Sequence, residues 1–198
     1  MRVVIIGKKW LAESVLSLCL DAGHVVVKVI APAGDKIYSH AQRGHIAVAQ
    51  VAQCVEESHI PENVDLIIAA HAHVFISQQA RAKARLGAIG YHPSLLPRHR
   101  GRDAVRWTIH MGDKIAGGSV YWMDDGADTG DIAAQDWCHV LPDDTANTLW
   151  RRELGPMGVR LLGRVIADAA SGITRRLPQD DRVATFEPAF NTGRRLAL

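Results

Sequence analysis

The first 30 residues constrain the fold of this chain more than any other stretch. Residues 2–6, RVVII, form a mostly β-branched run that ends at Gly7, as in a buried parallel strand. Residues 10–20 place apolar side chains at helical spacing, and Gly23 favours a stop after them. Residues 24–30 predict a second buried strand. A strand, a helix and a strand in this order form a βαβ unit with a right-handed crossover, so we expect an α/β fold.

The remaining pattern continues this architecture without an internal repeat or a linker, so we expect one domain over residues 1–198. We expect a polar loop over residues 35–44, a C-terminal stretch without regular structure from Gly172, and a poorly ordered tail over residues 184–198. Gly155-Pro156 should bend or split the last helix. Further strands are predicted at residues 64–70, 87–91, 116–123 and 131–140, helices at 46–57, 103–110 and 145–169, and a short helix or turn at 78–86.

Composition excludes several classes of protein. The net charge of +2 is too balanced to indicate a nucleic-acid or membrane surface, and no run approaches the ~20 apolar residues that span a bilayer. The three cysteines show no CxxC spacing, which argues against a zinc knuckle or a disulfide framework. We therefore expect a cytoplasmic protein whose oligomeric state is open, a homodimer included.

The first βαβ turn raises the alternative of a dinucleotide site. The dinucleotide fingerprint is GxGxxG, whereas this turn reads GKKWLA and has one glycine. The close approach of the backbone to a pyrophosphate is therefore missing, which disfavours a nicotinamide or flavin dinucleotide.

Two loops carry the residues that are suited to chemistry. The first is IGYHPSLLPRHRGR, residues 89–102, in which His92 follows a predicted strand and prolines restrict the backbone after it. The second is MDDGADTGD, residues 123–131, in which glycines flank Asp128. An imidazole exchanges protons near neutral pH, and a carboxylate can orient it. From residue types alone, a structural histidine and a solvated acidic turn remain an equal alternative.

Three long motifs, HPSLLPRHRG, DDGADTGD and LPDDTANTLW, resemble the formyltetrahydrofolate-dependent formyltransferase family. That family includes the glycinamide ribonucleotide and methionyl-tRNA formyltransferases, and the likeness is greatest to the hydrolase domain of 10-formyltetrahydrofolate dehydrogenase. The resemblance implies a Rossmann-like fold, with a mostly parallel central sheet and helices on both faces. It also implies 10-formyltetrahydrofolate as a co-substrate and no metal.

The resemblance also implies roles for individual residues. The family's catalytic histidine and aspartate fall on His92 and Asp128, and Gly90 stands where the family usually has an asparagine. Arg100 and Arg102 could meet the folate glutamates or a phosphorylated acceptor near the opening, although a plain surface role is an alternative for each. The residues expected to bind folate or substrate are Val74, Phe75, Ile76, Leu86, Gly90, Tyr91, Asp124, Asp125, Gly126 and Ala127.

The implied reaction is transfer of a formyl group to a small amine. One alternative is hydrolysis of 10-formyltetrahydrofolate to tetrahydrofolate and formate, and another is a folate-binding protein without catalysis. A metal site built from His71, His73 and His92 is a third, disfavoured reading, although the HxH spacing places two rings on one face of a strand. Transfer to initiator tRNA is disfavoured by the absence of a marked basic excess.

Overall fold

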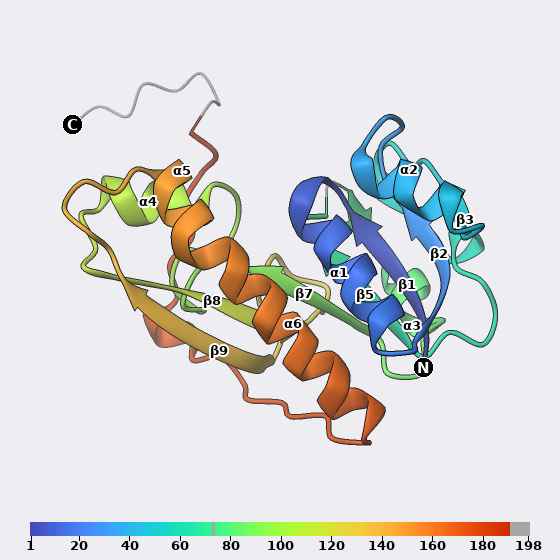
Figure 1. The fold of residues 1–198 in the computed structure, drawn as a ribbon. Helices are drawn as coiled ribbons and strands as arrows, with labels where there is room; N and C mark the ends of the chain where they lie inside the picture. The colour runs from blue at the N-terminus through green and yellow to red at the C-terminus, as the bar shows by residue number, and fades with distance from the viewer. Residues whose placement is uncertain (73, 191–198) are drawn as a thin grey trace.

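The computed structural model describes residues 1–72 and 74–190 and is built around a seven-stranded sheet in the order β3-β2-β1-β5-β7-β8-β9 (Figure 1). The pairs from β3 to β7 are parallel, and β8 and β9 add two antiparallel strands at one edge. The strands of this sheet are β1 (Arg2–Gly7), β2 (Val25–Ile30), β3 (Ala47–Ala49), β5 (Leu66–Ala70), β7 (Ala88–His92), β8 (Ile115–Trp122) and β9 (Ile132–His139).

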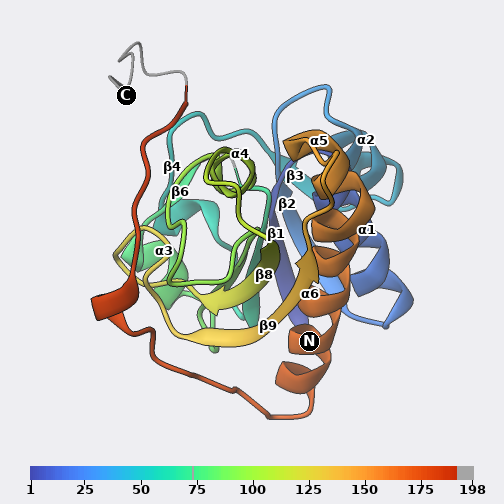
Figure 2. The same cartoon turned by 90° about the vertical axis from the view of Figure 1, so that its left-hand side faces the viewer.

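Helices cover both faces of the sheet, which confirms the expected mostly parallel α/β architecture (Figure 2). Alternate residues of β1 point to opposite faces, so Val3 and Ile5 join one core cluster while Val4 and Ile6 join the other. The first cluster packs under α1 (Lys9–Asp21) and α6 (Gly155–Ala170). The second packs under α3 (Gln78–Ala82) and a small parallel sheet made of β4 (Cys54–Val55) and β6 (Phe75–Ile76).

Two predictions between β2 and β5 are wrong. Residues 35–44 are not a loop, because Lys36–Arg43 form α2. Asp35 caps this helix by accepting a hydrogen bond from Ile37 N at 3.2 Å, and Ile37 and Ala41 bury one face, four residues apart. Residues 46–57 are not a helix. They contribute β3, which extends the parallel sheet beyond β2, and β4, which pairs with β6, before the 3₁₀ turn η1 (Glu57–His59).

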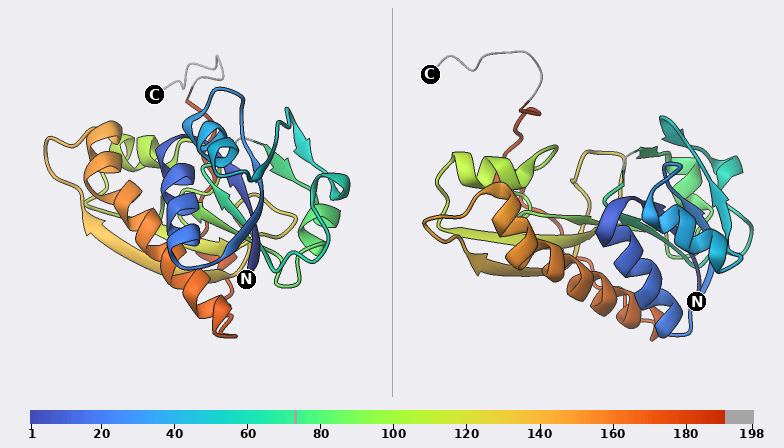
Figure 3. Two further views of the ribbon diagram at one scale, coloured as in Figure 1. Left: turned by 45° about the vertical axis from the view of Figure 1, so that its right-hand side comes forward. Right: turned by 45° about the horizontal axis from the view of Figure 1, so that its top comes forward.

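The chain after β7 follows the predicted pattern more closely. Asp103–His110 was expected to be a helix, and α4 occupies Ala104–His110. The long helix predicted over residues 145–169 consists of α5 (Ala146–Leu149), a π-helical turn η2 (Trp150–Leu154) and α6. Pro156 lies in the first turn of α6, where a proline is tolerated, so the split occurs at the predicted place. Figure 3 shows α6 running diagonally across the sheet.

The segment after α6 is more ordered than the sequence suggested. Within residues 184–190, which we expected in a poorly ordered tail, Thr185 pairs with Pro97 and Arg100, and Trp107 Nε1 donates to the carbonyl of Pro188. A 3₁₀ turn, η3 (Asp181–Val183), precedes these contacts. Residues 191–198 lie outside the described residues. In the described part of the chain, no helix combines the length and apolarity that crossing a membrane requires.

Candidate active site

The candidate site lies at the carboxyl ends of the central parallel strands. Ile6 of β1 pairs with Ala69 of β5, and Ala69 pairs with Gly90 of β7, so these three residues form one row across the sheet. His92 ends β7 two residues beyond this row. Ligands of open α/β sheets bind outside the carboxyl ends of the strands, so the topology places His92 where such a site is expected.

His92 and Asp128 are brought together by the two loops, as we expected from the sequence. His92 Nδ1 lies 3.4 Å from Asp128 Oδ2, and the two side chains are 9% and 17% exposed. His92 Nε2 lies 2.7 Å from the carbonyl oxygen of His99, so this nitrogen carries a proton and donates it. The distance to Asp128 is longer than an ordinary N–H···O hydrogen bond, a common feature of catalytic pairs before substrate binds.

The carboxylate of Asp128 is held by two further donors. Gly101 N donates to Oδ2 at 2.8 Å, and the hydroxyl of Tyr121 donates to Oδ1 at 2.6 Å. Asp128 itself has a φ of 58°, a left-handed conformation that aspartate adopts more readily than most residues. The aspartate is therefore fixed in backbone and in side chain, with one oxygen directed at His92.

Gly90 and Tyr121 form a matched pair in neighbouring antiparallel strands. Gly90 of β7 lies opposite Tyr121 of β8, and a Cβ at position 90 would lie 3.1–3.2 Å from three atoms of the tyrosine ring and hydroxyl. Burial is the main cause that raises the pKa of Tyr121 well above its usual value, and the charge of Asp128 raises this pKa further. The phenol therefore stays a proton donor. The absence of a side chain at Gly90 makes room for this tyrosine.

A hollow of about 430 Å³ lies beside the loop that carries Asp128. Of the residues expected to bind folate, Leu86, Asp124 and Asp125 line it. Arg81, whose side chain is buried, spans its wall by pairing with Asp125 and donating to the carbonyl of Ile76. The hollow has the size of a small-molecule site and carries both guanidinium and carboxylate groups.

The other expected binding residues lie elsewhere. Ile76 is buried in the second core cluster, Val74 packs against that cluster, and Phe75 is 56% exposed. Gly126 and Ala127 are exposed in the aspartate loop. Tyr91 points away from the hollow, because its hydroxyl donates to the carbonyl of Leu154 at 2.6 Å.

Arg100 does not lie at an opening, as we had expected, but is buried and 2% exposed. Its guanidinium donates to Gln179 and Asp181 of the C-terminal segment, so it is committed to contacts inside the chain. Arg102 is exposed. Within residues 1–72 and 74–190 there is no group of three His, Cys, Asp or Glu side chains that could hold a metal ion, and His73 lies outside the described residues.

Comparison with known proteins identifies the family of this chain. A family model described as formyl transferase matches residues 1–162. The chain belongs to the formyl transferase family. The cytosolic 10-formyltetrahydrofolate dehydrogenase of Xenopus laevis is 37% identical over 202 residues, which cover 95% of this chain and 22% of the relative. The chain therefore spans about a fifth of the length of that relative.

Solved structures share the fold of this chain. Glycinamide ribonucleotide transformylase 1 from Symbiobacterium toebii superposes with a TM-score of 0.74 and 24% identity, covering 90% of this chain and 92% of that one. An N-formyltransferase from Helicobacter canadensis, solved with folinic acid and dTDP-3-aminofucose, gives a TM-score of 0.76 at 19% identity, covering 93% and 70%.

Three residues that contact the candidate site or the hollow were missed at the sequence level: Tyr121, Arg81 and Gln179. Tyr121 lies on a strand whose pairing with β7 decides what it touches, and Arg81 looked like one of several basic residues on a short helix. Gln179 lies in a stretch that gave no periodic signal, and it is outside the residues that the family model matches. The only sequence signal was the missing side chain at Gly90, which indicates that a neighbour fills that space.

Proposed function

We propose that this chain catalyses transfer of the formyl group of 10-formyltetrahydrofolate to a small amine. The observation that carries the proposal is the His92–Asp128 pair, which is buried at the carboxyl edge of the sheet. The loop that carries Asp128 also lines a hollow of ligand size through Asp124 and Asp125. An imidazole held by a carboxylate is suited to general acid–base catalysis of acyl transfer.

In the proposed reaction the amine nitrogen attacks the formyl carbon, which is bonded to N10 of the folate. A tetrahedral intermediate forms, and its oxyanion is stabilised by the positive charge of protonated His92, since both ring nitrogens are already occupied by His99 O and Asp128. Asp128, aimed at His92 Nδ1, orients the ring and assists removal of the proton from the attacking amine. The bond from the carbon to N10 then breaks, N10 takes up the proton, and the formamide and tetrahydrofolate leave.

The pteridine ring is proposed to occupy the hollow, with Leu86 as its apolar wall and Asp124 and Asp125 as its polar edge. Asp124 is preorganised for this task, because its Oδ1 accepts hydrogen bonds from Gly126 N at 3.1 Å and Thr129 Oγ1 at 2.7 Å. The expected contacts of Gly126 and Ala127, which do not line the hollow, remain predictions. The expected contacts of Val74, Phe75, Ile76, Gly90 and Tyr91 with folate remain predictions as well.

Hydrolysis of 10-formyltetrahydrofolate is the second candidate, because water in place of the amine requires the same two proton-transfer groups. Two observations favour it. Gly90 offers no side chain to the reacting centre, and its space is filled by Tyr121, which is already committed to Asp128. The relatives at 33–37% identity over at least 94% of this chain are 10-formyltetrahydrofolate dehydrogenases.

The test is to measure tetrahydrofolate release from 10-formyltetrahydrofolate, first without an acceptor and then with a panel of small amines. Release only with one amine supports transfer and identifies the acceptor, whereas steady release without amine supports hydrolysis. Binding without release in either assay would leave a folate-binding protein and refute both catalytic proposals.

His92→Ala should lower the rate by about 10²–10³ in either case, as loss of one oxyanion donor typically does, while folate binding is largely kept. His139→Ala is the matched control, because His139 is an exposed histidine at the far end of β9. Full activity of His92→Ala would show that the roles assigned here are wrong.

A further inference from the structure

The C-terminal strap, residues 177–190, connects the two loops that carry His92 and Asp128. At its start, Leu177 exchanges backbone hydrogen bonds of 2.8 and 3.0 Å with Ile132, directly after the aspartate loop. Towards its end, Thr185 N donates to the carbonyl of Pro97, and Arg100 N donates to the carbonyl of Thr185. In Figure 2 the strap leaves α6 and rises along the side of the sheet opposite that helix.

Gln179 is the residue of the strap that touches both loops at once. Its Nε2 donates to the carbonyl oxygen of Asp128 at 2.9 Å and to that of Gly130 at 2.7 Å. Its Oε1 accepts from Arg100 Nε at 3.0 Å and Nη2 at 2.8 Å. Both amide hydrogens and the amide oxygen are therefore used, and they join the aspartate loop to the histidine loop through one side chain.

The separation of these loops determines the geometry of the catalytic pair. Asp128 Oδ2 is oriented by Gly101 N, which belongs to the histidine loop, while the backbone of Asp128 belongs to the aspartate loop. The left-handed conformation of Asp128 is less favourable than a right-handed one and persists only if its surroundings hold it. A hydrogen bond to the Asp128 carbonyl restrains that same residue.

We propose that Gln179 is a positioning residue, whose amide fixes the aspartate loop against Arg100 and so sets the distance between Asp128 and His92. At Gln179 the strap then does more than cover the sheet, because this side chain joins the two loops. This inference rests on the proposed function for its kinetic consequence, because the distance matters to catalysis only if these two residues transfer protons.

Two variants distinguish the contact of Gln179 with the aspartate loop from its contact with Arg100. Gln179→Leu removes both contacts at similar length. Gln179→Glu keeps an acceptor for Arg100 but places carboxylate oxygens against two carbonyls, so only the contact with the aspartate loop is lost. Asp181→Asn is the matched control, because Asp181 binds the same guanidinium at 2.7 Å from a side chain that is 81% exposed and lies on the same strap.

We expect kcat for 10-formyltetrahydrofolate turnover to fall by about 10- to 100-fold in Gln179→Leu and Gln179→Glu, since a misplacement near 1 Å can cost about 10² in rate. KM for the folate should stay within about threefold, and Asp181→Asn should keep kcat within about twofold, because neither change misplaces the catalytic pair. If Gln179→Leu does not fold, Gln179→Glu and the control carry the test. Unchanged kcat in a folded Gln179 variant would overturn the proposal, as would an equal loss in Asp181→Asn.

A second readout does not depend on activity. Nitrogen-15 NMR of the His92 ring reports its hydrogen bonding, so the His92 signals should move in Gln179→Glu and stay in place in Asp181→Asn. If the wild type releases no tetrahydrofolate but these shifts occur, the proposed function fails while the positioning role stands. Unmoved His92 signals in Gln179→Glu would overturn the positioning role even in an active enzyme.

Discussion

Tyr121 is the residue whose hydroxyl supports Asp128 most directly, and Tyr121→Phe tests it alone. The variant keeps the ring that packs over Gly90 and removes the hydrogen bond of 2.6 Å to Asp128 Oδ1. A hydrogen bond to a charged group contributes about 1.5–3 kcal/mol, so we expect kcat to fall about tenfold or more. The measurement is steady-state turnover of 10-formyltetrahydrofolate.

Tyr91→Phe is the control for this experiment. The Tyr91 hydroxyl donates to the carbonyl of Leu154, on the face of the sheet covered by α6, so its loss should reduce stability more than kcat. Gly90→Ala should resemble Tyr121→Phe, because the added Cβ displaces the tyrosine ring from Asp128. Wild-type kcat in Tyr121→Phe would show that Gly101 N alone suffices to hold the carboxylate.

At this scale the sequence singles out the two residues to which we assign chemistry, but not the residues that contact them. His92 and Asp128 stand out because prolines or glycines surround them and their side chains exchange protons. Tyr121 is one aromatic residue in a strand, and its contact with Asp128 depends on β8 running antiparallel to β7. That pairing is a tertiary property, which local sequence patterns do not encode.

At the scale of the elements, α6 packs closely against β7 at Gly158, which faces the ring of Tyr91. This contact predicts the effect of an alanine at position 158. A Cβ at Gly158 would lie 2.7 Å from Cε1 and 2.8 Å from Cδ1 of the buried Tyr91 ring. Overpacking costs about 1–3 kcal/mol, which exceeds the gain of about 1 kcal/mol from alanine in a helix. Gly158→Ala should therefore lower Tm by about 2–4 °C.

The same helix supplies the control for this prediction. A Cβ at Gly163 would meet Leu18 Cδ1 at 2.8 Å, but that atom is the end of a flexible, half-buried side chain that can move. Gly163→Ala should leave Tm unchanged or raise it. Calorimetry on the two variants checks both statements, and an equal rise in Tm for both would mean that Tyr91 yields as readily as Leu18.

The elements that the sequence predicted well are those with an unambiguous period. β1, β5 and β7 are buried on both faces and read as continuous apolar runs, and α6 has a strong helical stripe. The predictions for the region between β2 and β5 were wrong because the short elements there are determined by tertiary contacts. Ala47–Ala49 is a strand because β2 offers an edge, and Cys54–Val55 is a strand because Phe75–Ile76 passes beside it.

Across the whole molecule, the site depends on contacts between segments far apart in the chain. Gln179 is 51 residues from Asp128, and Thr185 is 86 residues from His99, whose backbone N–H it accepts. A buried hydrogen bond follows the same pattern, because Glu187 Oε1 lies 2.9 Å from His99 Nδ1. No local pattern predicts such pairs, so the strap looked like an unstructured tail in the sequence although it contacts both loops of the candidate site.

The carboxylate of Asp65 joins the beginnings of two central strands, β1 and β5. This contact makes the stability of the fold depend on pH in a defined direction. Arg2 N donates to Asp65 Oδ2 at 2.8 Å, and Arg85 Nε donates to Oδ1 at 2.9 Å. These hydrogen bonds, the backbone one first, lower the pKa of Asp65 below its ordinary 3.8. The folded state then binds fewer protons than the unfolded one, so the stabilisation is present above pH 3.8 and is lost as pH falls through the lower, folded value.

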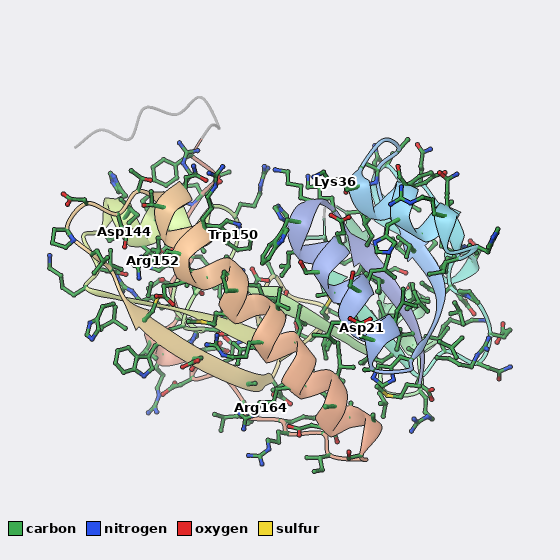
Figure 4. All side chains as sticks on the ribbon, in the orientation of Figure 1. Asp21, Lys36, Asp144, Trp150, Arg152 and Arg164 are labelled. Carbon is green, nitrogen blue, oxygen red and sulfur yellow. The ribbon has the colours of Figure 1, made fainter. Side chains whose placement is uncertain are left out.

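Asp65→Asn tests this link by removing the charge while keeping the size of the side chain. The variant should have a lower Tm than wild type at pH 7. The difference should narrow as pH falls from 3.8 through the lower, folded value, because the unfolded carboxyl takes up a proton first and the folded one follows. The effect should be small and little affected by salt, because Arg85 is 64% exposed and screened while the bond to Arg2 N involves no second charge. Asp21→Asn, an exposed carboxyl at the end of α1 (labelled in Figure 4), should show no such convergence. A difference in Tm between Asp65→Asn and wild type that stays constant from pH 7 to pH 3 would mean that the charge of Asp65 contributes nothing and that only its shape does.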